Sequence, residues 1–228
     1  MDTEDLIYPI FQCPGSLLIN GPSHSGKTSI VCRLIIHIES LFSKQFEDII
    51  YCYTESPGVV AKIDSKIHLH SGLPDQDTLN EWIDSFDNKP WFLIMDDMST
   101  DFYNSDISAQ LLSRLIHHHN CFLAVISHSL FGGGKNARLA SLNFHYFMFT
   151  RSCRDTQQIS RFGVQIFGKG HSTQFLQIYQ DATDLRPSQR PGYLLVHLHP
   201  RFSHKSRMLF TNIFNEDGEP LILYRLQT

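Results

Sequence analysis

The sequence alternates between apolar runs of strand length and segments whose apolar residues recur at helical spacing. The apolar runs predict strands over residues 16–20, 48–53, 66–70, 91–96, 121–127, 144–150, 193–197, 208–212 and 221–225. The helical spacing predicts helices over residues 26–42, 77–86, 105–119, 155–167 and 172–182, the second capped by Asp75 or Asp77. This alternation is typical of α/β proteins in which helices flank a mainly parallel sheet. Because the sequence shows no internal repeat and no long linker, we expect one domain over residues 1–228.

The composition is that of an ordinary globular protein, with 42% hydrophobic and 18% charged residues. The longest apolar runs, at residues 91–95 and 121–126, are far shorter than a membrane span. The chain begins with an acidic segment, whereas a secretion signal begins with basic residues. We therefore expect an intracellular protein without a membrane span.

Cysteines and histidines are frequent enough to raise the question of a metal site. The five cysteines are scattered, and none forms a Cys-x-x-Cys pair: Cys13, Cys32, Cys52, Cys121 and Cys153. Several lie in apolar runs, which favours buried reduced thiols over disulfides or a zinc site. Residues 117–119 are three consecutive histidines, but on a helix their side chains point in three directions. They indicate a solvated helix end rather than a metal site.

Charge is distributed unevenly along the chain, although the net charge is only -4. Residues 1–132 contain 7 Lys or Arg and 17 Asp or Glu, a balance of -10. Residues 133–210 contain 11 Lys or Arg and 3 Asp or Glu, a balance of +8. A basic surface on one side of the fold would suit the phosphates of DNA. The alternative is that folding mixes the two groups of charges in space.

The most informative motif lies between the first predicted strand and the first predicted helix. Residues 21–28 match the pattern G-x-x-x-x-G-K-[ST] in the strand–loop–helix context that this pattern requires. The segment consists of Gly21, Pro22, Ser23, His24, Ser25, Gly26, Lys27 and Thr28. In such a loop, backbone N–H groups and the helix N-terminus point at phosphate oxygens. Lys27 is expected to neutralise the β- and γ-phosphates of ATP, and Thr28 to bind Mg²⁺.

Two carboxylates follow the apolar strand predicted at residues 91–96. An unpaired charge at the end of a buried strand is unfavourable, so these acids need a partner. We expect Asp96 to hold Mg²⁺, through water, and Asp97 to polarise the water that attacks ATP. Together with the loop at residues 21–28, the two acids favour hydrolysis over binding alone. The alternative for Asp97 is a helix cap or a solvent-facing acid.

Further polar residues lie at the ends of neighbouring strands. His128 follows the strand predicted at 121–127, where it is a candidate sensor of the γ-phosphate or an ordinary loop histidine. Glu55 follows the strand at 48–53 and either orients water or Asp97, or is an exposed loop acid.

Arginines in the second half of the chain are candidates for completing the site of a neighbouring subunit. A planar guanidinium suits the spread charge of a phosphoryl group in transfer. We rank Arg154 first and Arg138 second, and Arg151 is the third candidate. Each can instead form a salt bridge or face DNA.

Beyond these motifs, the sequence resembles the genome-packaging ATPases of the FtsK/HerA superfamily, in particular the poxvirus-type branch of large DNA viruses and Maverick/Polinton elements. The resemblance spans about residues 8 to 214. It is carried by the segments 18–28, 49–53, 94–98, 129–131, 138–143, 154–155, 181–183 and 192–196.

The resemblance implies a P-loop NTPase fold with a RecA-like core, a ring-shaped homo-oligomer of five or six subunits, and ATP-driven movement of double-stranded DNA into a capsid. Capsid portal or vertex proteins are then partners, and the host cytoplasm or nucleus, at sites of virion assembly, is the location. By motif, the resemblance assigns Lys27 and Thr28 to nucleotide and Mg²⁺, Asp96 to the metal and Asp97 to catalysis.

Two departures from the family pattern bear on the site. His128-Ser129 stands where related elements carry Gln-Asn, and residues 151–154 replace Lys-Asn-Pro-Arg. An ATP-binding switch or scaffold with little turnover is therefore the alternative to a DNA motor. A small-molecule phosphotransferase is disfavoured, because the sequence shows no acceptor pocket or lid signature.

Overall fold

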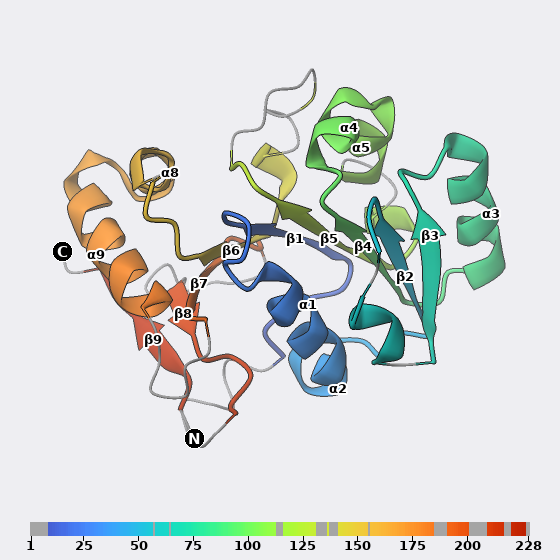
Figure 1. The fold of residues 1–228 in the computed structure, drawn as a ribbon, viewed down its shortest axis with the longest axis horizontal. Coiled ribbons are helices and arrows are strands. Elements are labelled where there is room, and N and C mark those ends of the chain that lie inside the picture. The colour runs from blue at the N-terminus through green and yellow to red at the C-terminus, as the bar shows by residue number, and fades with distance from the viewer. Residues whose placement is uncertain are drawn as a thin grey trace.

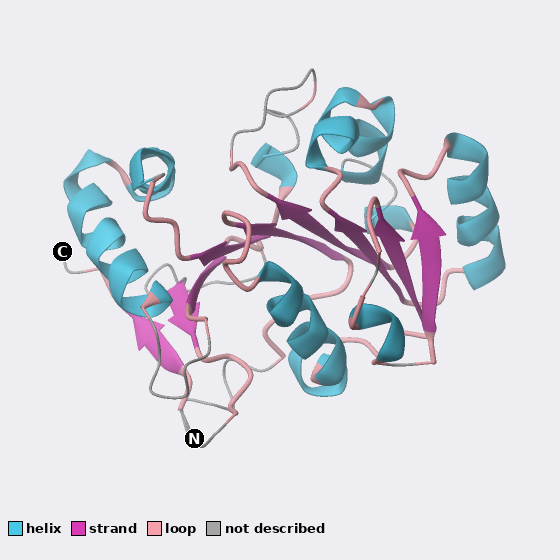
Figure 2. Ribbon diagram, viewed as in Figure 1, coloured by secondary structure: helices cyan, strands magenta, loops and turns pink. Residues whose placement is uncertain are grey.

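Nine strands form one sheet that is covered by helices on both faces (Figures 1 and 2). This arrangement is seen in a computed structural model of the chain. The structure describes residues 9–56, 58–63, 65–112, 116–130, 136, 141–154, 156–184, 191–200, 209–216 and 220–226. Within those ranges, no helix is both long enough and apolar enough to cross a membrane.

The strands are β1 (Gly15–Asn20), β2 (Asp48–Tyr53), β3 (Ile67–Ser71), β4 (Trp91–Asp96), β5 (Cys121–Ser127), β6 (Tyr146–Thr150), β7 (Tyr193–His197), β8 (Leu209–Thr211) and β9 (Ile222–Tyr224). The α-helices are α1 (Lys27–Ile36), α2 (Ile38–Leu41), α3 (Gln76–Phe86), α4 (Ser99–Asn104), α5 (Asp106–Gln110), α6 (Ile116–His118), α8 (Thr156–Phe167) and α9 (Ser172–Thr183). Two short 3-10 helices lie at Val60–Lys62 and Lys169–His171.

The sheet has the order β3-β2-β4-β5-β1-β6-β7-β8-β9. All neighbours from β3 to β6 are parallel, and β7, β8 and β9 continue the sheet in antiparallel pairs. The predicted mainly parallel α/β sheet is therefore confirmed. Because β1, β4 and β5 are parallel, their carboxyl ends meet at one edge, where ligands of open α/β sheets bind.

Each face of the sheet has its own apolar core, because side chains alternate between the two faces of a strand. Leu17 and Ile19 of β1 pack with Val31 of α1 on one face. Leu18 lies between them in sequence and packs in the opposite core, which also holds Phe162 of α8. Burial on both faces explains why the central strands are continuous apolar runs rather than alternating ones.

Substitution of Phe122 by alanine is expected to cost about 3–5 kcal/mol of unfolding free energy. Phe122 is fully buried on β5 and contacts Phe11, Phe42 and Phe92, with ring centroids 4.8 to 5.8 Å apart. Urea unfolding measures the change. Ile36→Ala is the matched control: Ile36 is 62% exposed, so its loss should change stability by less than about 0.5 kcal/mol. Equal costs for the two variants would contradict this account of the core.

The predicted strands all form, most of them with bounds within one residue of those expected, and Asp75 caps α3 by accepting from the Thr78 N–H at 2.8 Å. One helix prediction is wrong in its extent. The helix expected over 26–42 is interrupted at His37, which lies outside helical conformation and contacts Glu216 at 2.7 Å. Within the range expected to be helical at 105–119, the structure describes α5 and α6, and α4 precedes them without having been predicted.

The division between α4 and α5 has a local cause. Ser105 adopts an extended conformation, and its hydroxyl accepts a hydrogen bond from the Ile107 N–H at 3.1 Å. Serine side chains that bond to nearby backbone favour helix starts over helix interiors. A new helix therefore begins at Asp106.

All five cysteines are free thiols. Cys13, Cys52 and Cys121 are buried as expected, Cys32 is half-buried and Cys153 is exposed. Within the described ranges, no group of three or more His, Cys, Asp or Glu side chains is arranged to hold a metal ion.

Candidate functional site

The predicted site residues converge on the sheet edge where β1, β4 and β5 end. The loop at residues 21–28 follows β1, Asp96 ends β4, and His128 follows β5. The register places Asn20 of β1 beside Ser127 of β5, and the Gly21 N–H donates to the Ser127 carbonyl at 3.2 Å. Residues far apart in sequence thereby meet around the first turn of α1.

The shape of the loop depends on its glycines. Gly26 has φ 94°, a left-handed conformation that favours glycine, and it directly precedes the first residue of α1. Gly21 lies so close to β6 that an added Cβ would be 1.8 Å from the Thr150 hydroxyl oxygen. The Thr150 hydroxyl in turn lies 2.6 Å from the Ser25 hydroxyl. The close packing of the loop against Thr150 of β6 therefore also favours glycine at position 21 and a small hydroxyl side chain at position 25.

Lys27 is folded back against its own loop. Its Nζ donates to the carbonyl oxygens of Gly21 and Pro22, both at 2.9 Å, and lies 3.2 Å from Nδ1 of His128. The residue is only 7% exposed. Burial lowers the pKa of the Lys27 amine, and the nearby charges of Asp97 and Asp96 oppose that shift. An anionic ligand in the loop would be a further counter-charge for this amine.

His128 connects the lysine to the second acid. Its Nε2 lies 2.7 Å from an Asp97 carboxylate oxygen, and its Nδ1 faces Lys27. A protonated amine has no acceptor, so Nδ1 must accept and the ring proton must be on Nε2, donated to Asp97. Asp97 itself has φ 57°, a left-handed conformation that is uncommon outside glycine. The three side chains form one continuous chain of hydrogen bonds.

Asp96 is paired with a residue that sequence reasoning missed. The hydroxyl of Tyr51, buried on β2, donates to the Asp96 carboxylate. Burial raises the pKa of Asp96; the Tyr51 hydrogen bond opposes this shift, Asp97 adds to it, and Lys27 and His128 oppose it. The strand register explains the contact: Tyr53 pairs with Asp96, and Tyr51 lies two residues earlier on the same strand face.

The donor set around the loop suits Mg²⁺. Thr28 is exposed on the first turn of α1, and Asp96 supplies a carboxylate oxygen at the same sheet edge. Mg²⁺ prefers oxygen ligands and commonly takes one or two protein groups together with waters and phosphate oxygens. The small number of protein ligands therefore fits Mg²⁺ bound together with a nucleotide.

A cleft of about 760 Å³ lies on the outer side of the loop. It is lined by Pro22, Ser23, His24, Ser25, Arg151, Ser152, Cys153, Arg154, Thr183, Pro191 and Gly192. Its volume is in the range of clefts that hold small ligands. Arg151 is engaged by Asp184 through a side-chain ion pair, whereas Arg154 is exposed at the cleft beside the loop of its own subunit.

The remaining predicted residues take no described part in this site. Arg138 lies outside the described residues. Glu55 is exposed after the end of β2. Ser129 forms hydrogen bonds to the Ser127 hydroxyl through its backbone N–H and carbonyl.

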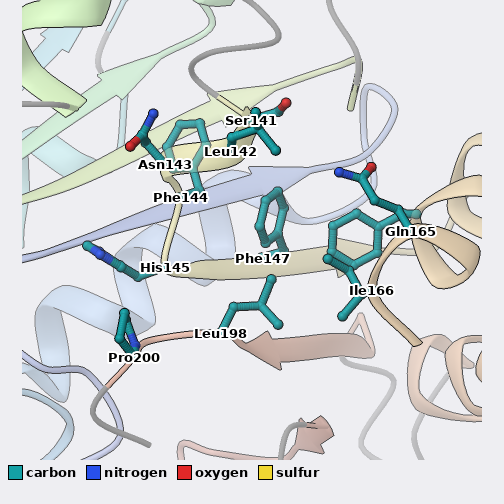
Figure 3. A pocket seen from close by; sticks show the side chains of 11 residues that line it. Ser141, Leu142, Asn143, Phe144, His145, Phe147, Gln165, Ile166, Leu198 and Pro200 are labelled. Carbon is teal, nitrogen blue, oxygen red and sulfur yellow. The ribbon is translucent and has the colours of Figure 1, made fainter. Parts of the chain in front are cut away.

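A second cavity, of about 300 Å³, lies at the opposite edge of the sheet, where β6 begins and β7 ends. Figure 3 shows Asn143, Phe144 and His145 on one side of it and Gln165 and Ile166 of α8 on the other. None of the predicted site residues lines this cavity.

The structure is similar to two solved viral proteins. One is the genome packaging NTPase B204 from Sulfolobus turreted icosahedral virus 2 in complex with ATP-gammaS, with TM-score 0.53 and 9% identity over 97% of this chain and 100% of that chain. The other is B204, the DNA-packaging ATPase from Sulfolobus turreted icosahedral virus, with TM-score 0.51 and 10% identity over 81% of this chain and 93% of that chain. This chain shares the fold of these viral packaging proteins.

The expected resemblance to a packaging ATPase is confirmed at the level of the fold. No family model matches the sequence, and a search of curated proteins gives no match. With 9% and 10% identity, the likeness concerns the arrangement of helices and strands.

Proposed function

We propose that this chain hydrolyses ATP to drive double-stranded DNA into a viral or transposon capsid. The observation that carries the proposal is the hydrogen-bonded chain of Lys27, His128 and Asp97 against a phosphate-binding loop. A cation, an imidazole and a carboxylate that lie together beside such a loop support a role for these three side chains around the γ-phosphate of a bound nucleotide. The packaging role is supported by the fold shared with B204, a viral genome-packaging NTPase. A ring of five or six subunits, with capsid portal or vertex proteins as partners, completes the proposal and rests on the sequence resemblance alone.

Each of these residues has its own role in the proposed phosphoryl transfer. The N–H groups of the loop and the first turn of α1 hold phosphate oxygens, and Lys27 leaves its carbonyl partners to bind the β- and γ-phosphates. Thr28 and Asp96 would hold Mg²⁺, which neutralises charge on the phosphates when bound. Tyr51 fixes the Asp96 carboxylate. Asp97 and His128, which contact each other, are the groups that would orient the attacking water.

The cleft beside the loop is our candidate for the adenosine part of ATP. Its lining includes Ser23 and His24 of the loop together with Arg154 and Gly192. From this position, Arg154 is within the reach of a nucleotide in its own subunit. Its role across a subunit interface, and that of Arg138, stay predictions.

The alternative is an ATP-binding switch or scaffold with little turnover. It is motivated by the departures from the family pattern at His128-Ser129 and at residues 151–154. Retention of ATP without turnover in an assembled ring would support this alternative.

DNA-stimulated hydrolysis is the direct test of the proposed function. We expect phosphate release from ATP to increase when linear double-stranded DNA is added, and specific activity to rise with protein concentration as subunits assemble. The measurement is phosphate release over a dilution series, with and without DNA. Activity that is insensitive to DNA and unchanged in a demonstrated monomer would contradict a ring-shaped DNA motor.

A further inference from the structure

His128 is held in position by hydrogen bonds around its backbone and at both nitrogens of its ring. Its backbone is bracketed by two hydrogen bonds: the Ser127 hydroxyl donates to the Ser129 carbonyl at 2.7 Å, and the Ser129 N–H donates to the Ser127 hydroxyl at 3.1 Å. Its ring is held at both nitrogens, by Lys27 and by Asp97. The orientation of the imidazole is therefore determined by the site.

This orientation disagrees with a sensor that donates a hydrogen bond to the γ-phosphate. The only ring proton of neutral His128 lies on Nε2 and is given to Asp97. The nitrogen that faces the loop, Nδ1, carries a lone pair and accepts from Lys27. A phosphate oxygen is an acceptor as well, so Nδ1 has no hydrogen to offer it.

We propose that His128 is the general base of the hydrolysis, with Asp97 holding its ring and Lys27 covering the accepting nitrogen until a nucleotide draws the lysine away. The inference rests on the proposed function. When Lys27 turns to the phosphates, Nδ1 loses its donor. A water molecule is the natural replacement, because the His128 side chain is 40% exposed to solvent.

The reaction step balances without a further reactant. The water oxygen forms a bond to the γ-phosphorus, and the bond from that phosphorus to the oxygen bridging to the β-phosphate breaks, its electron pair staying on ADP. The proton lost by the water goes to Nδ1 of His128. The resulting imidazolium lies against the Asp97 carboxylate, which stabilises its charge. The proton then leaves with the phosphate or to solvent.

Among the residues that the structure describes, three charged groups interact with His128. They are Lys27 at the start of α1, Asp97 after β4 and, acting at longer range, Asp96 at the end of β4. Protonation of His128 before the reaction would fill Nδ1 and block the step. The rate should therefore fall toward acidic pH.

The test is the pH–rate profile at saturating Mg²⁺ and ATP for the wild type and for His128→Gln, together with binding of ATP-gammaS. We expect kcat of the variant to be about 10²-fold lower than that of the wild type, and its pH–rate profile to have no acidic limb. Its affinity for ATP-gammaS should stay within about threefold of that of the wild type. His68→Gln is the matched control, because His68 forms a similar pair with Asp48 at 2.6 Å on the exposed strand β3. Its profile should match that of the wild type.

Asp97→Asn separates the two candidate bases. If His128 accepts the proton, this variant is slower but keeps the acidic limb. The opposite result would overturn the inference and leave the ATPase proposal standing: His128→Gln would keep the acidic limb and a rate close to that of the wild type, and Asp97→Asn would lose both. A wild type that binds ATP-gammaS but hydrolyses no ATP at any pH would overturn both. Should His128→Gln fail to fold, ¹⁵N NMR of the wild-type ring decides, since a proton on Nδ1 contradicts the inference.

Discussion

Lys27→Ala is expected to lower kcat/KM for ATP by about 10²- to 10³-fold, the range for removal of a preorganised group that stabilises developing charge. Lys27 is the one loop side chain in contact with both the loop carbonyls and His128. Without its amine, the loop retains N–H groups for the phosphates but loses the positive charge beside the γ-phosphate. The measurement is steady-state hydrolysis together with binding of ATP-gammaS.

A matched control for this prediction is Lys89→Ala. Lys89 is exposed and pairs with Glu47 only at 4.0 Å, so its removal should leave hydrolysis unchanged. The unfolding midpoint of Lys27→Ala should stay close to that of the wild type. Burial lowers the pKa of the Lys27 amine, so the charged amine is unfavourable in the folded chain, and its removal offsets the loss of its hydrogen bonds. Normal hydrolysis in folded Lys27→Ala would exclude the proposed mechanism.

Asp96→Asn is expected to reduce Mg²⁺-dependent hydrolysis by a similar factor, about 10²- to 10³-fold. The amide keeps the size of the side chain and can still accept from Tyr51, but it no longer offers a charged ligand. Nucleotide affinity measured without Mg²⁺ should change little, whereas the gain in affinity on adding Mg²⁺ should be lost. Binding titrations with and without Mg²⁺ measure this difference.

The free energy of unfolding of Asp96→Asn is a second test of the role of Asp96. Burial raises the pKa of Asp96, so in Mg²⁺-free buffer its ionised form is less favourable in the folded chain than in the unfolded one. Asp96→Asn should then unfold at an equal or higher urea concentration at neutral pH, and this gain should vanish as the pH falls below the ordinary aspartate range. Asp48→Asn, on the surface beside His68, is the control. A clear loss of stability in Asp96→Asn would indicate a structural role instead.

The strands were predictable because each central one is buried on both faces and reads as an uninterrupted apolar run. Trp91–Asp96 and Cys121–Ser127 agree with the sequence pattern residue for residue. The helix ends were less predictable, because distant residues decide them. His37 leaves the helix beside Glu216, which lies in another part of the chain. Such contacts have no local signal.

The site was predictable to the extent that its residues follow strands. Lys27, Asp96 and His128 could be assigned to one sheet edge from their positions after apolar runs, and the structure brings them together. What the pattern could not give is the direction of each hydrogen bond. The partnership of Tyr51 with Asp96, and of His128 with both Lys27 and Asp97, depends on rotamers and on strand register.

The central place of β1 has a consequence for the order in which the protein can be built. Its Asn20 side chain bonds to Ser127, 107 positions later, and its Asn20 carbonyl accepts from Thr150, 130 positions later. Pairings of such separation form slowly, since a long loop must close first. A chain emerging from the ribosome therefore carries residues 21–28 early, but the walls around them are complete only after β6 has been made.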